Sequence, residues 1–365
     1  MVDSVLFSPI YIGSIEIVNR FMRSATHDFL AEEDGSISSR QLELYRQLAA
    51  GEVGLIVTGH AFVLPSGKAS PRQIAASDDR FIPGLKTLAS VVHGFQSKIF
   101  LQLSHAGRQT KEKICNCQPI APSAVYEPVY KIWPREMSQA DIEEVIQAFV
   151  AAAGRAHQAG FDGVQLHCAH GYLLSSFLSP YTNRRQDQWG GSLENRFRVI
   201  REILRRIKKE IGQNFPVMAK LNSSDYLPGG LEMEEAVAVA KLLSAEGLNA
   251  IEVSGGSAES GRGSMWPGQR PEEEEGYFVP AAITIRKAVN IPVIGLGGLR
   301  TFRVMERLVA TGQIDLVSMS RPFIREPDLV AKFKSGEKAA ASCISCNKCF
   351  NPRGIACAEL KKTQG

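Results

Sequence analysis

Short apolar runs alternate along this chain with longer amphipathic stretches, and the alternation repeats eight times. The apolar runs predict strands at 21–24, 55–59, 99–103, 163–167, 217–221, 250–254, 293–295 and 316–319. The amphipathic stretches predict helices at 40–51, 80–96, 139–159, 195–212, 233–247, 279–289, 302–312 and 326–334. Eight strand–helix units are typical of an α/β fold of the (β/α)8 TIM-barrel type. A doubly wound sheet is the alternative, but it usually has a glycine-rich turn after its first strand, which this chain lacks.

The length and composition favour one large domain. A chain of 365 residues with 44% hydrophobic content is sufficient for a single large core. We expect the barrel at 1–335 and a short cysteine-rich C-terminal tail at 336–365. Residues 5–18 predict a hairpin that plugs the barrel bottom, and 104–138 predict a long loop over the barrel mouth. Loops of that length are usually functional.

Charge and hydropathy exclude several functional classes. The chain has 42 Lys and Arg against 38 Asp and Glu, and no basic stripe indicates a nucleic-acid partner. Neither a secretory signal nor an apolar run of membrane-spanning length is present. Seven cysteines, an odd number, argue against a disulfide framework. We therefore expect a cytoplasmic protein.

The densest polar cluster, His167-Cys-Ala-His170-Gly-Tyr172, comes directly after the fourth predicted strand. Catalytic groups of TIM barrels gather at the carboxyl ends of the strands. Histidines three residues apart can point the same way on a helical turn, so His167 and His170 could both hydrogen-bond one oxygen atom. The phenol of Tyr172 could then deliver a proton. The alternative is that these are satisfied structural groups.

Two further strand ends indicate a phosphate site. Gly297 and Gly298 follow the seventh strand and Ser320-Arg321 follows the eighth, where TIM barrels often bind phosphate. Glycine lets backbone amides approach oxygen atoms closely, and Arg321 would add a charge-assisted contact. A tight turn beside a surface salt bridge is the alternative.

Lys220 lies inside an apolar strand and therefore needs an anionic or strongly polar partner. It suits either the Schiff-base chemistry of an aldolase or the stabilisation of negative charge on a reduced flavin. Gln102, at the end of the third strand, can both donate and accept, which suits the rim of a flavin ring better than aldolase chemistry. Residues 24–26 and 59–60 could offer backbone groups to the other edge of the ring.

These segments resemble the Old Yellow Enzyme-type NAD(P)H:flavin oxidoreductases. The resemblance covers roughly residues 4–335 and rests on 19–20, 102–108, 167–196, 215–220 and 320–323. It implies a TIM barrel with tightly bound FMN. NAD(P)H would deliver a hydride to the flavin, and flavin N5 would pass it to the β-carbon of an activated alkene.

The resemblance also implies residue roles. His167 and His170 resemble the pair that holds the substrate carbonyl oxygen, and Tyr172 resembles the proton donor to the α-carbon. The implied flavin-ring contacts are Ser24, Ala25, Thr26, His27, Gly59, His60, Gln102 and Lys220, and the implied phosphate site is Gly297, Gly298, Ser320 and Arg321. His27 stands where the family usually has Thr or Cys. Lys220 stands where many members have Arg, which keeps the charge but not the bidentate geometry.

The tail contains four cysteines, at 343, 346, 349 and 357. They resemble the 4Fe–4S loop of dienoyl-CoA reductase and trimethylamine dehydrogenase, although the last one, Cys357, follows at a shorter spacing. Those enzymes carry further flavin and nucleotide domains beyond the cluster, which we do not expect in a chain ending at Gly365. A 4Fe–4S cluster held by Cys343, Cys346, Cys349 and Cys357, a zinc or other site, and a vestige without metal all stay open.

The primary interpretation is an FMN-dependent ene-reductase for small enones or enals. The second is a dienoyl-CoA reductase-like or amine-dehydrogenase-like flavoprotein that passes electrons through a cluster to a separate protein. Residues 254–257 lack the His that dienoyl-CoA reductases use near there, which counts against that substrate. An aldolase-like lyase using Lys220 and a silent flavin-binding module are the remaining alternatives. Candidate protein partners are a second copy of the chain and, with a cluster, an electron-transfer protein.

Overall fold

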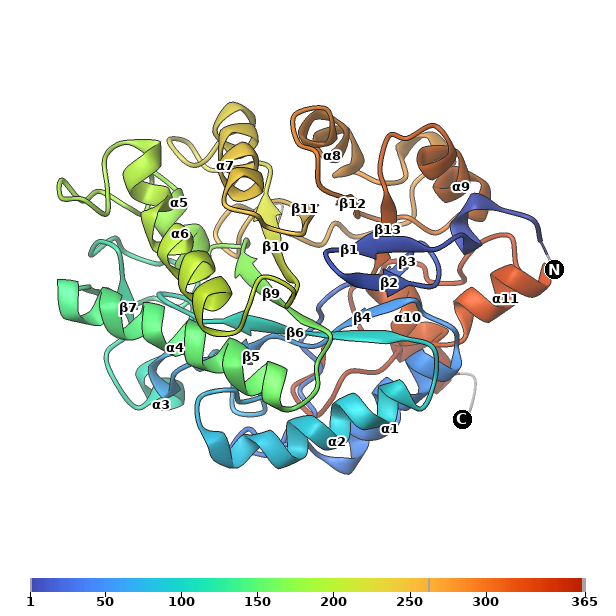
Figure 1. The fold of residues 1–365 in the computed structure, drawn as a ribbon, viewed down its shortest axis with the longest axis horizontal. Coiled ribbons are helices and arrows are strands. Elements are labelled where there is room, and N and C mark those ends of the chain that lie inside the picture. The colour runs from blue at the N-terminus through green and yellow to red at the C-terminus, as the bar shows by residue number, and fades with distance from the viewer. Residues whose placement is uncertain (1, 262, 363–365) are drawn as a thin grey trace.

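Eight parallel strands close into a barrel in the computed structural model, which describes residues 2–261 and 263–362 (Figure 1). The barrel strands are β3 (Phe21–Arg23), β4 (Leu55–Val57), β6 (Lys98–Ser104), β9 (Gly163–Cys168), β10 (Val217–Asn222), β11 (Ala250–Ser254), β12 (Val293–Gly295) and β13 (Leu316–Met319). β13 pairs in parallel with β3, which closes the ring. A short strand, β5 (Ala61–Phe62), adds to β6. All eight predicted strands are confirmed.

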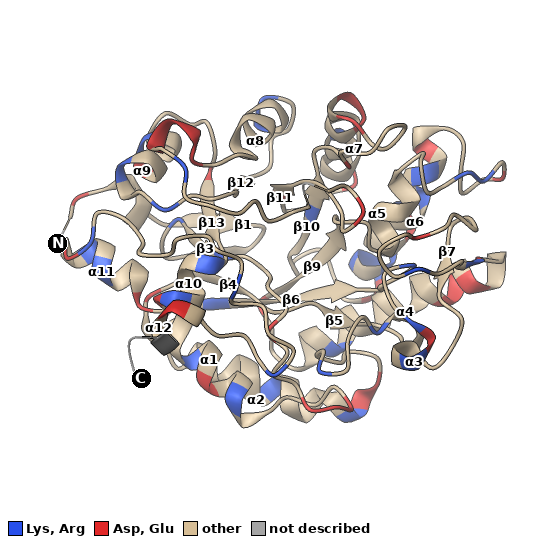
Figure 2. Cartoon of the chain, turned by 180° about the vertical axis from the view of Figure 1, so that it is seen from behind, with Lys and Arg blue, Asp and Glu red and all other residues tan. Residues whose placement is uncertain are grey.

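The predicted helices are also confirmed, and they surround the barrel (Figure 1). They are α1 (Ser39–Ala50), α2 (Ile82–His93), α4 (Gln139–Gln158), α6 (Leu193–Glu210), α7 (Met233–Ala245), α8 (Val279–Arg286), α9 (Phe302–Ala310) and α11 (Leu329–Ser335). Figure 2 shows that the charged residues lie mostly on the helices and loops, while the strands are largely uncharged. Within the described residues, no helix is long and apolar enough to cross a membrane.

Additional short helices mark where the boundaries differ from expectation. They are α3 (Glu112–Cys115), α5 (Leu173–Leu178), α10 (Arg321–Arg325) and α12 (Ala358–Lys362), with 3₁₀ turns at Val5–Phe7, Pro65–Gly67, Asp79–Phe81 and Glu272–Glu274. The last barrel helix begins at Leu329 rather than 326. Pro327, which has no backbone N–H and disfavours a helical conformation in the residue before it, separates that helix from α10.

The predicted plug is present as an antiparallel hairpin of β1 (Ile10–Ile12) and β2 (Ile15–Ile17). Its Ile12 and Ile17 are buried in one cluster with inward-facing barrel residues, among them Phe100. This inner cluster is separate from the larger core between the strands and the outer helices. The hairpin therefore packs against the apolar interior at the amino ends of the strands.

The segment 104–138 is more ordered than the long loop that we expected. It contains α3 and a two-stranded parallel sheet of β7 (Ile120–Ala121) and β8 (Arg135–Glu136). The tail also packs on the barrel: Ala341 N donates to Arg300 O, and Ile355 N donates to Asp28 O. The tail therefore lies against the loops that follow β12 and β3.

We predict that Phe100→Ala lowers the free energy of unfolding by about 3–5 kcal/mol, because the ring fills the inner cluster beside Gly163. Chemical denaturation measures the change. Phe95→Ala, at a position that is 39% exposed, is the control and should cost less than about 1 kcal/mol. An equally small loss for Phe100→Ala would mean that the inner cluster contributes little to stability.

Candidate active site

The strand ends and the loops that follow them enclose a cavity of about 380 Å³, called here the main cavity. Eleven of the predicted site residues line it: Ser24, Ala25, Thr26, His27, His60, Gln102, His167, His170, Tyr172, Lys220 and Ser320. Gly297, Gly298 and Arg321 line an adjoining space, the glycine hollow, which shares Leu296 and Ser320 with the main cavity. Gly59 is not among the residues lining either space, and its N–H donates to the Tyr45 hydroxyl at 2.8 Å.

His167, His170 and Tyr172 come together on one wall of the main cavity. The ring centroid of His167 lies 5.1 Å from that of His170 and 4.6 Å from that of Tyr172. The Nδ1 atom of His167 is buried and has no hydrogen-bond partner among the described residues. His170 Nε2 lies 2.7 Å from the Ser254 hydroxyl, which the sequence analysis did not single out. The three side chains therefore present polar atoms to one enclosed space.

The backbone at His170 is held in an uncommon conformation. Its φ angle is +63°, in the left-handed region that non-glycine residues rarely adopt. Its N–H donates to Asn222 Oδ1 at 3.1 Å, and its carbonyl accepts from Gln109 Nε2 at 2.5 Å. At Gly171 a Cβ atom would lie 2.5 Å from that same Nε2. Asn222, at the end of β10, and Gln109, in the loop after β6, thus hold the backbone of His170 in this conformation, as is common at functional sites.

Burial sets the protonation states of these groups. It lowers the pKa of His167 and of His170 well below the ordinary value, and the nearby charge of Lys220 acts in the same direction. Burial also raises the pKa of Tyr172 well above the ordinary value. At neutral pH the wall therefore consists of two neutral imidazoles, each with one N–H, and a protonated phenol.

Lys220 finds the anionic partner that its apolar strand demands. Its Nζ donates to Ser24 Oγ at 2.7 Å and lies 3.4 Å from Glu252 Oε1. The sequence analysis missed Glu252, although it stands inside the apolar run 250–254 as Lys220 does inside its own. The two residues pair directly in the parallel register of β10 and β11.

The end of β3 contributes a compact set of polar contacts. Thr26 Oγ1 lies 2.7 Å from the Ser320 hydroxyl, which joins the ends of β3 and β13. His27 Nε2 lies 2.6 Å from Ser70 Oγ. The ring of His60, whose pKa burial lowers to about 4, lies 4.9 Å from that of His27. One edge of the main cavity is thus lined by hydroxyls and neutral imidazoles.

The glycine hollow has no room for side chains at its turn. Gly297 and Gly298 have φ angles of +114° and +78°. A Cβ atom would lie 2.9 Å from the Tyr277 ring at the first position and 3.0 Å at the second. Arg321 faces the hollow from α10 and donates to Trp266 O at 2.9 Å and Asn347 Oδ1 at 2.6 Å. A backbone turn and a guanidinium thus meet here, as an anion site requires.

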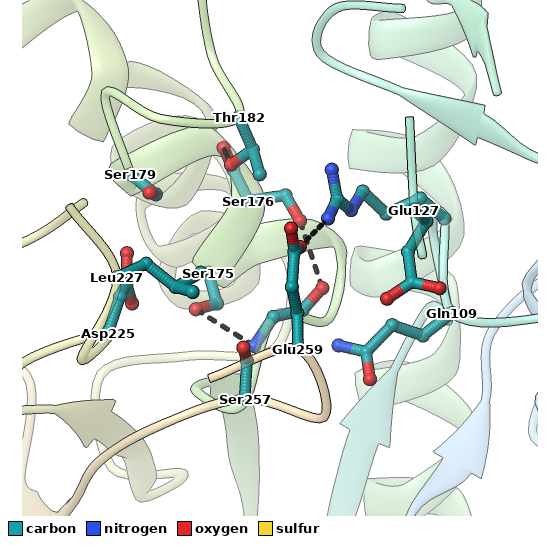
Figure 3. Close-up of a pocket in the computed structure, with 12 residues that line it drawn as sticks. Gln109, Glu127, Ser175, Ser176, Ser179, Thr182, Asp225, Leu227, Ser257 and Glu259 are labelled. Atoms are coloured by element: carbon teal, nitrogen blue, oxygen red, sulfur yellow. Dashed lines mark hydrogen bonds and ion pairs between the residues drawn. The ribbon is translucent and has the colours of Figure 1, made fainter. Parts of the chain in front are cut away.

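A smaller polar pocket lies beside the main cavity and joins two of the loops (Figure 3). Arg108, after β6, forms a buried ion pair with Glu259, after β11. Glu259 also accepts from the Tyr181 hydroxyl at 2.6 Å. Figure 3 shows the Glu259 side chain between Gln109 and Ser176. These contacts connect the loops after β6 and β11, which flank the His170 turn.

The four tail cysteines share one hollow, the cysteine hollow, with Arg321 and Arg325. They are Cys343, Cys346, Cys349 and Cys357, and none of them forms a disulfide. Among the described residues, no three His, Cys, Asp or Glu side chains are placed to hold a single metal ion. Phe350 from the same tail lines the main cavity, so the cysteine hollow and the main cavity lie close together.

Comparisons with known proteins point to one family. A family model described as NADH:flavin oxidoreductase / NADH oxidase matches residues 5–339. The chain is 41% identical over 345 residues to an NADH oxidase of Thermoanaerobacter brockii, covering 94% of this chain and 52% of that protein. It is 37% identical over 326 residues to an NADPH dehydrogenase of Geobacillus sp. (strain WCH70), covering 89% and 92%.

A solved structure shows the same likeness. The structure of 2-naphthoyl-CoA reductase with 2-naphthoyl-CoA matches with a TM-score of 0.88 at 32% identity, covering 94% of this chain and 54% of that one. The chain therefore spans about half the length of this reductase and of the Thermoanaerobacter relative, but nearly the whole of the Geobacillus relative.

Burial also makes stability depend on pH. His105, in the loop after β6, is buried, and burial lowers its pKa to about 3. Because the unfolded chain binds a proton near pH 6.5, the stability that neutral His105 contributes is complete above that pH and is lost as the pH falls toward 3. We predict that His105→Gln removes about 2 kcal/mol of the stability loss between pH 7 and pH 5. Denaturant titrations at both pH values measure this, and parallel pH profiles for the two proteins would contradict it.

Proposed function

The chain belongs to the NADH:flavin oxidoreductase / NADH oxidase family, the family of Old Yellow Enzyme, and we propose that it is an FMN-dependent ene-reductase. The substrates would be small α,β-unsaturated carbonyl compounds, whose C=C bond is reduced with electrons from NADH or NADPH. The observation that carries the proposal is the gathering of His167, His170 and Tyr172 on one wall of the main cavity.

The residues present suit FMN. Lys220 and Gln102 line the main cavity, where they would meet a flavin ring, together with residues 24–27 and His60. The glycine hollow would hold the phosphate through the backbone at 297–298, Ser320 and Arg321. Bound FMN supplies hydride transfer, from NAD(P)H and then to the β-carbon of the alkene.

The two histidines would polarise the substrate carbonyl. If the Ser254 hydroxyl donates to Nε2 of His170, the ring proton of His170 lies on Nδ1. The Nδ1 atom of His167 has no hydrogen-bond partner among the described residues. Neutral imidazole N–H groups in a site with little water stabilise the negative charge that develops on a carbonyl oxygen as the alkene is reduced.

Tyr172 would supply the proton that completes the reaction. Its raised pKa keeps the hydroxyl protonated at neutral pH, so a proton is available whenever substrate binds. Its ring lies beside that of His167, which places the phenol next to the proposed carbonyl site. The α-carbon of an enone is adjacent to the carbonyl carbon, which matches this arrangement.

We predict that Tyr172→Phe slows alkene reduction by about 10²- to 10⁴-fold and leaves flavin reduction by NAD(P)H nearly unchanged. Stopped-flow absorbance measures the two half-reactions separately. Tyr11→Phe, which removes an exposed hydroxyl bonded to Glu16 on the hairpin of β1 and β2, is the matched control and should leave both rates near those of the unmodified protein. Equal losses in both half-reactions of Tyr172→Phe would exclude Tyr172 as the proton donor.

A second candidate function rests on the tail. A flavoprotein of the dienoyl-CoA reductase or amine-dehydrogenase kind would pass electrons through a 4Fe–4S cluster to a partner protein. The four cysteines line one hollow, and four cysteine thiolates are the usual ligands of a 4Fe–4S cluster.

Arginines beside the cysteine hollow support the same candidate. Burial raises the pKa of Cys349 to about 11, and the charge of Arg321 acts in the opposite direction. Arg321 borders both the glycine hollow and the cysteine hollow. The residue proposed for the flavin phosphate therefore also faces the proposed thiolate ligands.

We predict that the protein, purified without oxygen, contains about four iron atoms and four acid-labile sulfides per chain. Cys346→Ser should lose most of this iron, because a thiolate ligand is removed. Cys117→Ser, which changes a cysteine outside the tail, should retain it. Stoichiometric zinc, or no metal in the unmodified protein, would contradict a cluster.

A further inference from the structure

Glu252 is a buried carboxylate that takes no part in the chemistry proposed above. Its side chain has 0% exposure and lies inside the barrel. Oε1 accepts from Ser24 Oγ at 2.6 Å and from Ser318 Oγ at 2.8 Å, and Oε2 accepts from Gln165 Nε2 at 3.0 Å. With Lys220, donors from three strands and from the residue directly after β3 converge on this one group.

The hydrogen-bond network around Glu252 extends to residues that line the main cavity. Gln165 Oε1 accepts from Gln102 Nε2 at 2.7 Å, and Lys220 donates to the same Ser24 hydroxyl that Glu252 binds. Gln102, Ser24 and Lys220 line the main cavity, whereas Glu252 and Gln165 are not among its lining residues. Glu252 is therefore linked to three proposed flavin contacts without being one of them.

The ion pair with Lys220 is the central contact of this network. A buried charge is costly unless it is paired and hydrogen-bonded, and Lys220 is the cation within 4 Å of Glu252. Burial lowers the pKa of Lys220, the charge of nearby Arg23 lowers it further, and Glu252 raises it. Removing the carboxylate would thus leave the buried Lys220 ammonium without its anionic partner and still close to the charge of Arg23.

We propose that Glu252 is a positioning residue that holds the Lys220 ammonium at the cavity wall, balances its charge and thereby sets the reduction potential of the bound flavin. This inference rests on the proposed function, since it requires FMN in the main cavity. A reduced flavin carries more negative charge than an oxidised one, so an ammonium beside it favours reduction. The carboxylate of Glu252 cancels part of the electric field of that ammonium. This keeps the reduction potential of the flavin lower than the ammonium alone would make it.

The test is the flavin potential of the FMN-loaded full chain, measured by equilibration with a redox dye at pH 6. In Glu252→Gln we expect the ratio of reduced to oxidised flavin at a fixed solution potential to rise at least tenfold, which is about 30 mV for a two-electron couple. Glu252→Asp keeps the charge and should stay near the unmodified protein. Asp162→Asn, which removes the partner of His93 and Lys98 before β9 begins, is the control and should not shift.

The pH dependence separates positioning from a purely structural role. Without Glu252, Lys220 should lose its proton at a lower pH. The increase in the ratio of reduced to oxidised flavin that Glu252→Gln causes should therefore become smaller between pH 6 and pH 9. The other titratable groups that face Lys220 are Arg23, His167 and His170. Burial keeps both histidines neutral throughout this range, and an arginine remains charged.

A second variant tests whether Glu252 acts through Lys220. In a Lys220→Met background the carboxylate no longer has an ammonium to position or balance, so adding Glu252→Gln should change the potential less than it does beside Lys220. Two results would overturn this inference while leaving the proposed function intact. One is a flavin potential that does not shift in Glu252→Gln, and the other is a shift of the same size when Glu252→Gln is added to Lys220→Met. An unmodified protein that takes up no FMN would overturn the proposed function with it. A shifted potential without enone turnover would overturn only the ene-reductase proposal.

Discussion

The structure depends on a single layer of polar side chains that crosses the barrel interior. Below it, the inward-facing residues are apolar: Met22, Phe100, Met218, Ala250 and Leu316. Two positions further along the same strands stand Ser24, Gln102, Lys220, Glu252 and Ser318. Because strand side chains alternate between two faces, each of these polar residues points into the barrel as its apolar predecessor does. A shift of one residue in any strand would turn its polar group out into the apolar shell.

The polar layer is stable because it is satisfied internally. Glu252 accepts hydrogen bonds from Ser24, Gln165 and Ser318 across the barrel interior, and Lys220 is its ion-pair partner. The hairpin of β1 and β2 packs on the apolar side of this layer, and the main cavity opens on the other. Loops clasped by the Arg108–Glu259 pair then hold the His170 turn over the cavity. The apolar hairpin thus supports the polar layer, and the polar layer and the connected loops hold the reactive side chains in place.

The sequence predicted the barrel well because every strand is a mainly apolar run and every gap between strands can hold a helix. It predicted most of the site because strand-end residues must meet at one mouth. It missed Glu252, since pairing with Lys220 depends on the register of β10 against β11, which strand composition does not specify. It did not indicate that the Gly59 N–H donates to the Tyr45 hydroxyl, which comes from a helix outside the barrel. The order within 104–138 was missed because β7 and β8 have only two residues each.

Visible spectra of the FMN-loaded protein test the flavin site and the proposed reaction most directly. They are recorded without oxygen, before and after NADPH or NADH and again after cyclohexenone. A flavin spectrum that bleaches with the nicotinamide and returns with the enone is the predicted result. A flavin that bleaches but stays reduced after the enone would contradict the ene-reductase proposal. If a broad brown absorbance also underlies that spectrum, electrons leave through the tail instead. A colourless protein that takes up no FMN would contradict the flavin site itself.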